Sequence, residues 1–234
     1  MAGLNYFAWE NALIAGVEVM VSRTGYTGDL GYEIWIDRDQ ALPVWDALMA
    51  AGKPQRLLPA GLDAMDVTRV EAGFILNGVD YFGSLHCLIE SRKSTPYEIG
   101  LGWAVKPERE RFLGKTALLK EKEDGSTWAL VGLVCDWDEF EQLFDKVGLP
   151  PQLPSGAWRD PVPVFDERGR QVGQATSGAW SPLLKKNLAL ATIPSGMSAV
   201  GTTLQIEVSV EYERKKVSAR VANKPFFDPE RKKA

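Results

Sequence analysis

The sequence contains few of the residues from which metal centres and disulfide frameworks are built. Its 234 residues include only 2 cysteines, Cys87 and Cys135, and a single histidine, His86. A zinc site needs three or four cysteine or histidine ligands at defined spacings, so no metal site is expected. A catalytic triad would depend entirely on His86, and a lone histidine beside an apolar run is more often structural.

Basic charge and long apolar runs are also scarce. The formal net charge is -4 at pH 7, which gives no basic field to hold a nucleic acid. Apolar stretches such as 128–135 are far shorter than the ~20 residues of a membrane-spanning helix. The first basic residue is Arg23, so the N-terminus lacks the pattern of a secretory signal. We therefore expect a cytoplasmic protein that binds neither nucleic acid nor membrane.

Two glycine-containing stretches resemble nucleotide-binding loops, and both lack essential residues. The stretch 112–116 ends in Gly-Lys-Thr, but Arg109 occupies the position where a phosphate loop requires glycine. The stretch 100–102 lacks the third glycine and the following helix of a dinucleotide fingerprint. Neither a phosphate-loop site nor a nicotinamide or flavin domain is expected.

What is present is an ordinary globular composition, with 45% hydrophobic and 25% charged residues, enough for one large domain or two smaller ones. Periodicity predicts strands over 7–14, 17–23 and 31–36, and helices over 39–51, 59–72 and 115–123. The third strand places Glu33 and Trp35 on one face. Asp39 is expected to cap the first helix, and Gly52 to end it.

The polar cluster at 123–126 is expected to separate two domains, 1–124 and 125–234. Beyond it, short strands are expected over 128–135, 162–165, 171–177, 188–193, 204–210 and 216–221. This spacing is typical of a small antiparallel barrel or jelly roll, with 138–154 as an insertion that contains a helix. The predicted fold class is α+β: mixed strands and helices, followed by a C-terminal antiparallel β-barrel or jelly-roll domain.

Four segments, in order along the chain, match the pattern of one family. They read S-R-T-G-Y-T-G-D-L-G-Y-E-I at 22–34, P-A-G-L-D-A-M-D-V-T-R-V-E-A-G at 59–73, G-L-G-W-A-V at 100–105 with F-L-G-K at 112–115, and T-S-G at 176–178 with S-P and L-K-K-N ending at Asn187. The first resembles the signature segment of the aminomethyltransferase family, the T-protein of the glycine cleavage system. The other three resemble further segments of the same family.

The resemblance implies a tetrahydrofolate-binding protein of one-carbon metabolism. Such a protein transfers a one-carbon unit to tetrahydrofolate from an aminomethyl donor, which in the T-protein case is carried by a lipoyl protein of the H-protein type. It implies that Tyr26 and Glu33 contact the folate, and it makes Arg69 and Phe74 further candidates for folate binding. The chemistry agrees, because one carboxylate can accept two adjacent N–H groups of a pterin and a tyrosine offers a ring face or a hydroxyl.

Departures from the family pattern concern the donor rather than folate. Met65 stands where the family's helix commonly carries arginine, and Phe74 replaces an aromatic hydroxyl, so it can stack but cannot hydrogen-bond. The segment 81–95 has no clear counterpart. Three functions stay open: an aminomethyltransferase or one of its subunits, a folate-linked O- or S-demethylase, and a non-enzymatic folate-binding accessory protein. The signature K-G-C-Y-x-G-Q of known accessory relatives is absent.

The largest departure is at the start of the chain. The family's N-terminal half, with the aspartate that positions the reacting folate nitrogen, has no counterpart before Met1. The catalytic residues are therefore unknown and are expected in that part. Three explanations are open: a separate N-terminal half or a homo-oligomer partner supplies it, the chain is a fragment, or catalysis is lost. A pocket lined from one side leaves its ligand exposed, so the isolated chain is expected to bind folate weakly.

Overall fold

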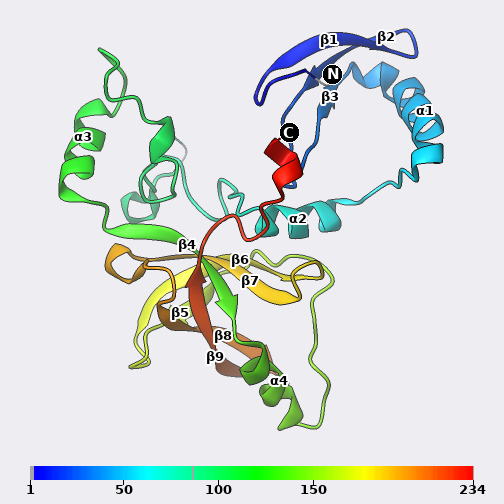
Figure 1. Ribbon diagram of the computed structural model, residues 1–234. Helices are drawn as coiled ribbons and strands as arrows, with labels where there is room; N and C mark the ends of the chain where they lie inside the picture. Colours follow the sequence, from blue (N-terminus) through cyan, green and yellow to red (C-terminus); the bar gives the residue numbers. More distant parts are fainter. Residues whose placement is uncertain (1–2, 86, 234) are drawn as a thin grey trace.

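The computed structural model describes residues 3–85 and 87–233 (Figure 1). An N-terminal part of mixed strands and helices is followed by a β-barrel, as the sequence predicts. The structural role expected for His86 lies outside the described residues. Among the described helices, none has the length and apolar character needed to cross a membrane.

The N-terminal part is built on a three-stranded antiparallel sheet. Its strands are β1 Trp9–Ile14, β2 Val17–Ser22 and β3 Glu33–Trp35, in the order β1-β2-β3. The β1–β2 turn at Ala15 and Gly16 has positive φ angles of 52° and 81°, as the tight turn of a hairpin requires. One face of the sheet buries Val19 and Val21 against Val44 of helix α1. The predicted hairpin is confirmed, and β3 is shorter than predicted.

Helix α1 covers this face and spans Ala41–Gly52 (Figure 1). It begins later than predicted, because a single 3-10 turn, Arg38–Gln40, precedes it. Asp37 caps that turn by accepting a hydrogen bond from the backbone N–H of Asp39 at 3.1 Å. The prediction of Asp39 as the cap of α1 is therefore wrong. The N-cap position of α1 is Gln40, which makes no side-chain capping hydrogen bond, so the side-chain cap belongs to the preceding turn.

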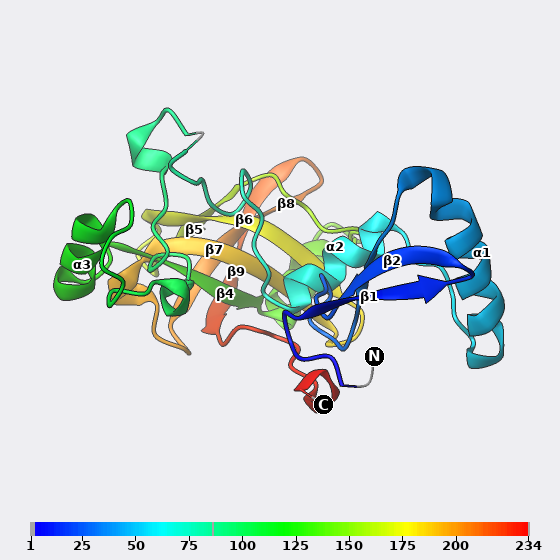
Figure 2. The ribbon, with the colours of Figure 1, turned by 90° about the horizontal axis from the view of Figure 1, so that it is seen from above.

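Helix α2, Leu62–Glu71, lies on the barrel strands β6 and β7, between the barrel and the N-terminal sheet (Figures 1 and 2). It is shorter than predicted at its start, where Gly61 is still extended. Helix α3 spans Lys115–Asp124, within one residue of the prediction. Its Lys115 side chain donates to the backbone oxygen of Arg109 at 2.6 Å. Further 3-10 turns lie at Lys53–Gln55, Glu90–Arg92, Gly102–Ala104, Ser195–Met197 and Glu230–Lys233.

Six antiparallel strands close the barrel in the order β4-β7-β6-β5-β8-β9. They are β4 Trp128–Cys135, β5 Val162–Phe165, β6 Gln171–Ser181, β7 Lys186–Pro194, β8 Thr203–Val210 and β9 Glu213–Ala222. Leu133, Ala191, Ile193, Leu204 and Ile206 fill the interior. The predicted barrel is confirmed. Strands β7 and β9 begin earlier than predicted because their first residues are polar and hide the strand pattern, and β6 continues past the predicted end to Ser181.

Helix α4, Trp137–Asp145, closes one end of the barrel within the predicted insertion (Figure 1). The side chain of Asp136 caps it by accepting from the backbone N–H of Glu139 at 3.0 Å. Phe140 and Phe144 pack against the β8–β9 hairpin. This leaves the opposite side of the barrel, along β6 and β7, for α2 and the N-terminal part.

Candidate functional site

Glu33 and Trp35 lie on the face of the N-terminal sheet that points away from α1. Both side chains are exposed, whereas Ile34 between them packs into the core with Val19 and Val21. The carboxylate Oε2 of Glu33 accepts a hydrogen bond from the hydroxyl of Thr24. Among the hydrogen bonds of the described residues, Thr24 is the only partner of this carboxylate. One carboxylate oxygen of Glu33 is thus hydrogen-bonded within the protein, and the other is available to accept hydrogen bonds.

A short polar chain fixes this pair. The hydroxyls of Ser22 and Thr24 are 2.7 Å apart, and the indole Nε1–H of Trp35 donates to Ser22 Oγ at 3.2 Å. The indole ring and the carboxylate are therefore joined through two hydroxyl groups that start the 22–34 segment. This linkage orients a flat aromatic surface beside an acceptor that can take further N–H donors.

The rest of this sheet face exposes large apolar side chains together with the polar Asn11 and Glu18. Trp9 is 61% exposed, Leu13 70% and Trp35 56%. A shallow hollow of about 530 Å³ lies along the β1–β2 hairpin, lined by Asn11, Leu13, Glu18 and Met20 of this face and by Ala12 and Val19 of the α1 side. Isolated monomers rarely expose so many large apolar side chains on one sheet face, which indicates an interaction surface.

Tyr26 lies in the glycine-rich loop between β2 and β3 and is half-buried. The loop packs closely on the end of α2: a Cβ atom built on Gly28 would lie 2.4 Å from the Cβ of Ala72. Gly28 also has a φ of +69°, so a side chain is excluded both by conformation and by space. The pKa of Arg159 is raised mainly by its hydrogen bond to Asp66, with a smaller electrostatic contribution from Tyr26.

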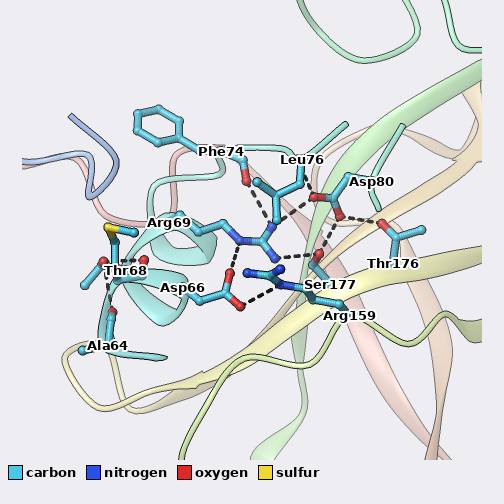
Figure 3. A network of polar contacts seen from close by, with 11 residues as sticks. Ala64, Asp66, Thr68, Arg69, Phe74, Leu76, Asp80, Arg159, Thr176 and Ser177 are labelled. Atoms are coloured by element: carbon cyan, nitrogen blue, oxygen red, sulfur yellow. Dashed lines mark hydrogen bonds and ion pairs between the residues drawn. The ribbon is translucent and has the colours of Figure 1, made fainter. Parts of the chain in front are cut away.

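Arg69 is fully buried at the centre of a polar network between α2 and the barrel (Figure 3). Its Nε donates to Asp66 at 2.6 Å, Nη1 to Asp80 at 3.0 Å and Nη2 to Ser177 of β6 at 2.9 Å. Nη1 also donates to the backbone oxygen of Phe74 at 3.2 Å. All three nitrogens of the guanidinium therefore have protein partners, and the side chain is 0% exposed. The contacts of Arg69 are thus all within the protein, and its link to folate stays a prediction.

Asp80 is the second buried charge of this network. Its Oδ1 accepts from Thr176 at 2.7 Å and from Ser177 at 2.6 Å, and its Oδ2 accepts from Arg69 and from the backbone N–H of Leu76. A buried carboxylate is tolerated only when it is paired and fully hydrogen-bonded, and Asp80 meets both conditions. It therefore ties the loop after α2 to β6.

Asp66 connects the network to the surface. Burial alone would raise its pKa, but the hydrogen bonds from Arg159 and Arg69 outweigh burial and hold the pKa below the usual value of aspartate. Arg159 Nε lies 3.0 Å from Asp66 Oδ2, and its side chain is 51% exposed. Arg159 thus presents a cation at the edge of the buried cluster.

Phe74, the fourth expected site residue, follows directly after α2. Arg69 holds its backbone oxygen, whereas its ring is 38% exposed and points away from the guanidinium cluster (Figure 3). The network therefore fixes the backbone of Phe74 and leaves the ring free to contact something else.

A second polar link joins α2 to the barrel. Ser181 of β6 donates its hydroxyl to Glu71 Oε1 at 2.5 Å, and both side chains are buried. Together with the pair of Arg69 and Ser177, this link joins the 59–73 segment to the 176–187 segment. The 22–34 segment joins them through Gly28 and Ala72. Three of the four recognised segments thus meet around α2.

The fourth segment lies apart from this assembly, on the side of α3 (Figure 1). It lines a separate apolar hollow of about 460 Å³, formed by Trp103, Ala104, Val105, Lys106, Arg109, Phe112 and Leu118. Within residues 3–85 and 87–233, no group of three or more histidine, cysteine or acidic side chains is placed to hold a metal ion.

Comparison with known proteins agrees with this assembly. A family model described as the GCVT N-terminal domain matches residues 1–109, and one described as the glycine cleavage T-protein C-terminal barrel domain matches residues 147–228. Among curated proteins, the chain is 37% identical over 229 residues to an aminomethyltransferase of Bacillus subtilis, covering 97% of this chain and 55% of that protein. It is 39% identical over 220 residues to an aminomethyltransferase of Symbiobacterium thermophilum, covering 93% and 50%.

A solved structure gives the same result. The crystal structure of glycine cleavage system aminomethyltransferase T from Bartonella henselae superposes with a TM-score of 0.75 at 25% sequence identity, covering 97% of this chain and 54% of that chain. The chain thus spans about half the length of the relatives that it matches.

Proposed function

Because the chain belongs to the aminomethyltransferase family of the glycine cleavage T-protein, we propose that it binds a reduced folate and serves in one-carbon transfer to tetrahydrofolate. The observation that carries this proposal is the exposed pair of Glu33 and Trp35, held in place by Ser22 and Thr24. We assign this pair to one wall of the folate site.

The chemistry of this wall fits a pteridine ring. The ring presents adjacent N–H donors that one carboxylate can accept in a bidentate geometry, and Glu33 has Oε1 and the second lone pair of Oε2 left for this purpose. Trp35 and Tyr26 add aromatic surfaces for a flat ligand. Tetrahydrofolate supplies the N5 amine that receives the one-carbon unit. The residues of this chain orient the ring, which is where much of the rate of such a transfer arises.

Arg69 serves this site indirectly in our proposal. It fixes the backbone of Phe74, leaves the ring exposed, and locks α2 onto β6. The Gly28 loop rests on the end of α2, so a rigid α2 keeps Tyr26 in position. Phe74 and Tyr26 stay proposed contacts of the folate, and the acid–base residue of the reaction is proposed to lie outside residues 1–234.

The open sheet face suggests what completes the site. Trp9, Leu13 and Trp35 are exposed on the same face as Glu33, and the relatives contain about as much chain again as this one. We propose that a polypeptide equivalent to the other half of the relatives covers this face and encloses the folate, as small-molecule sites usually require. We propose a lipoyl carrier of the H-protein type as the source of the one-carbon donor. We also propose that the protein is cytoplasmic and that its two domains meet after residue 124.

Folate binding is tested by titrating 5-formyltetrahydrofolate, a reduced folate that is stable in air, into the wild-type chain and into Glu33→Gln. The loss of a charged hydrogen bond should weaken binding by about 1–3 kcal/mol. Glu141→Gln, an exposed glutamate on α4, is the matched control and should bind like the wild type. Equal affinity of the wild type and Glu33→Gln would refute the role of Glu33.

Transfer is tested in a second assay, with the other half of a relative supplied in trans. An aminomethyl donor on a lipoyl carrier should yield methylenetetrahydrofolate only when both polypeptides are present. Methyl donors of the sulfonium and aryl ether classes test the demethylase alternative in the same mixture. Folate binding without turnover of any donor would favour the accessory-protein alternative.

A further inference from the structure

The last residues of the chain return from the barrel to the N-terminal part. We call residues 223–233, which follow β9, the C-terminal strap. Both views of the ribbon show that it leaves the barrel and ends beside the N-terminal sheet (Figures 1 and 2). Near its start, Lys224 Nζ donates to the backbone oxygen of Leu130 on β4 at 2.8 Å. Further along, the backbone N–H of Phe227 donates to the backbone oxygen of Glu71 at 2.9 Å.

The far end of the strap is joined to the glycine-rich loop. Arg231 Nε donates to Asp29 Oδ1 at 2.9 Å, and Arg231 Nη2 donates to Asp29 Oδ2, so the pair is bidentate. Asp29 Oδ1 also accepts from the backbone N–H of Leu30 at 2.7 Å. The hydrogen bond from Arg231 lowers the pKa of Asp29 and raises that of Arg231, so both stay charged at neutral pH.

The end of α2 holds the loop and the strap at adjacent residues. Gly28 of the loop lies against Ala72, and Phe227 of the strap is bonded to Glu71. Gly73 has a φ of +69°, and a Cβ atom built on it would lie 3.1 Å from the Cβ of Lys224, so the missing side chain lets the strap pass. The loop that carries Tyr26 is therefore held on one side by α2 and on another by the strap.

We propose that the C-terminal strap positions the glycine-rich loop for folate through the ion pair between Arg231 and Asp29. Arg231 is then a positioning residue, because it acts through Asp29. This inference rests on the proposed folate function of Tyr26 and Glu33. Glycines leave the loop many conformations, and fixing one of them before binding removes part of the entropic cost of holding the ligand.

The test uses Arg231→Gln, Asp29→Asn and the charge swap Asp29→Arg with Arg231→Asp. Hydrogen exchange of the amides of residues 25–31 is measured in the chain without folate, and affinity is measured with 5-formyltetrahydrofolate. Each single variant should speed exchange in the loop and weaken binding about two- to fivefold, the range of a partly exposed, well-oriented ion pair. The charge-swapped double variant should regain part of the protection of the loop from exchange and part of the folate affinity.

Lys215→Gln is the matched control, because it breaks an ion pair with Glu213 at the β8–β9 hairpin, away from the loop. It should leave exchange in the loop and folate affinity unchanged. The melting temperature of each variant separates positioning from general stability, since a positioning residue changes affinity while the melting temperature stays within about 2 °C of the wild type.

Unchanged exchange at residues 25–31 in Arg231→Gln would overturn the inference. A loss of affinity that follows a general loss of stability, or that the swap makes worse, would overturn it as well. Failure of the proposed function gives a different pattern: the wild type and all variants fail to bind folate, while exchange in the loop still responds to Arg231→Gln. That pattern would support the mechanical role of the strap and refute the assignment of the loop to folate.

Discussion

Replacing Arg69 by methionine is the sharpest test of how α2 is attached to the barrel. Methionine has an unbranched side chain about as long as the aliphatic part of arginine, but it cannot donate the hydrogen bonds to Asp66, Asp80 and Ser177. Asp66 retains Arg159, whereas the side chain of Asp80 is 0% exposed and loses its only cation among the described ion pairs. Removing one partner of a buried pair typically costs about 3–5 kcal/mol.

Urea unfolding followed by tryptophan fluorescence measures this loss, since the chain contains 8 tryptophans. A loss of that size is a large part of the total stability of about 5–15 kcal/mol of a typical domain. Arg170→Met is the control, because Arg170 forms an ion pair with Asp166 and its side chain is 66% exposed. Such a pair contributes about 1 kcal/mol or less.

A double variant makes the reasoning specific. Asp80→Asn keeps an acceptor for Thr176 and Ser177 but removes the negative charge. Arg69→Met with Asp80→Asn should therefore be more stable than Arg69→Met alone, because the buried carboxylate charge that lost its cation is removed as well. The account of the network would be refuted if Arg69→Met cost no more than Arg170→Met, or if adding Asp80→Asn made it less stable.

Two further predictions concern the loop and the strap. Gly28→Ala should lower the free energy of unfolding by about 1–3 kcal/mol and weaken folate binding, because the new methyl group would collide with Ala72 and Gly28 has a positive φ. Gly25→Ala is the control: Gly25 has open space around it, so the substitution should be nearly neutral in an unfolding titration. Burial lowers the pKa of Lys224 from 10.5 to about 8. Between pH 8 and pH 10.5 the unfolded chain therefore binds more protons at this residue than the folded chain does. The free energy of unfolding should rise with pH over this range, on the order of 2–3 kcal/mol. The rise should be missing in Lys224→Met; an equal rise in both proteins would contradict it.

Local signals predicted the elements well where strands and helices have clear periods. The strands at 128–135 and 162–165 match the structure residue for residue, because buried apolar residues fill them and turn residues bound them. The first helix was predicted to begin at Asp39, but a 3-10 turn occupies Arg38–Gln40, and a turn of three residues leaves no periodic signal in the sequence.

The candidate site was only partly predictable. The segment around Tyr26 and Glu33 is a local pattern, and the alternation of β3 correctly placed Glu33 and Trp35 on one face. The partners of Arg69 include Asp80 and Ser177, which are 11 and 108 residues away in the chain. The pair of Asp29 and Arg231 is separated by 202 residues. Neither periodicity nor spacing encodes such contacts, because only the folded chain brings them together.

The central claim is that the exposed face of β3 binds a reduced folate, and the indole N–H of Trp35 reports on it most directly. Its proton is hydrogen-bonded to Ser22 beside Glu33, whereas Trp128 lies at the start of β4 in the barrel. In a nitrogen–proton NMR spectrum, with both signals assigned by Trp→Phe variants, adding 5-formyltetrahydrofolate should shift the Trp35 indole signal and leave that of Trp128 in place. A Trp35 signal that stays unchanged at saturating folate would contradict the account.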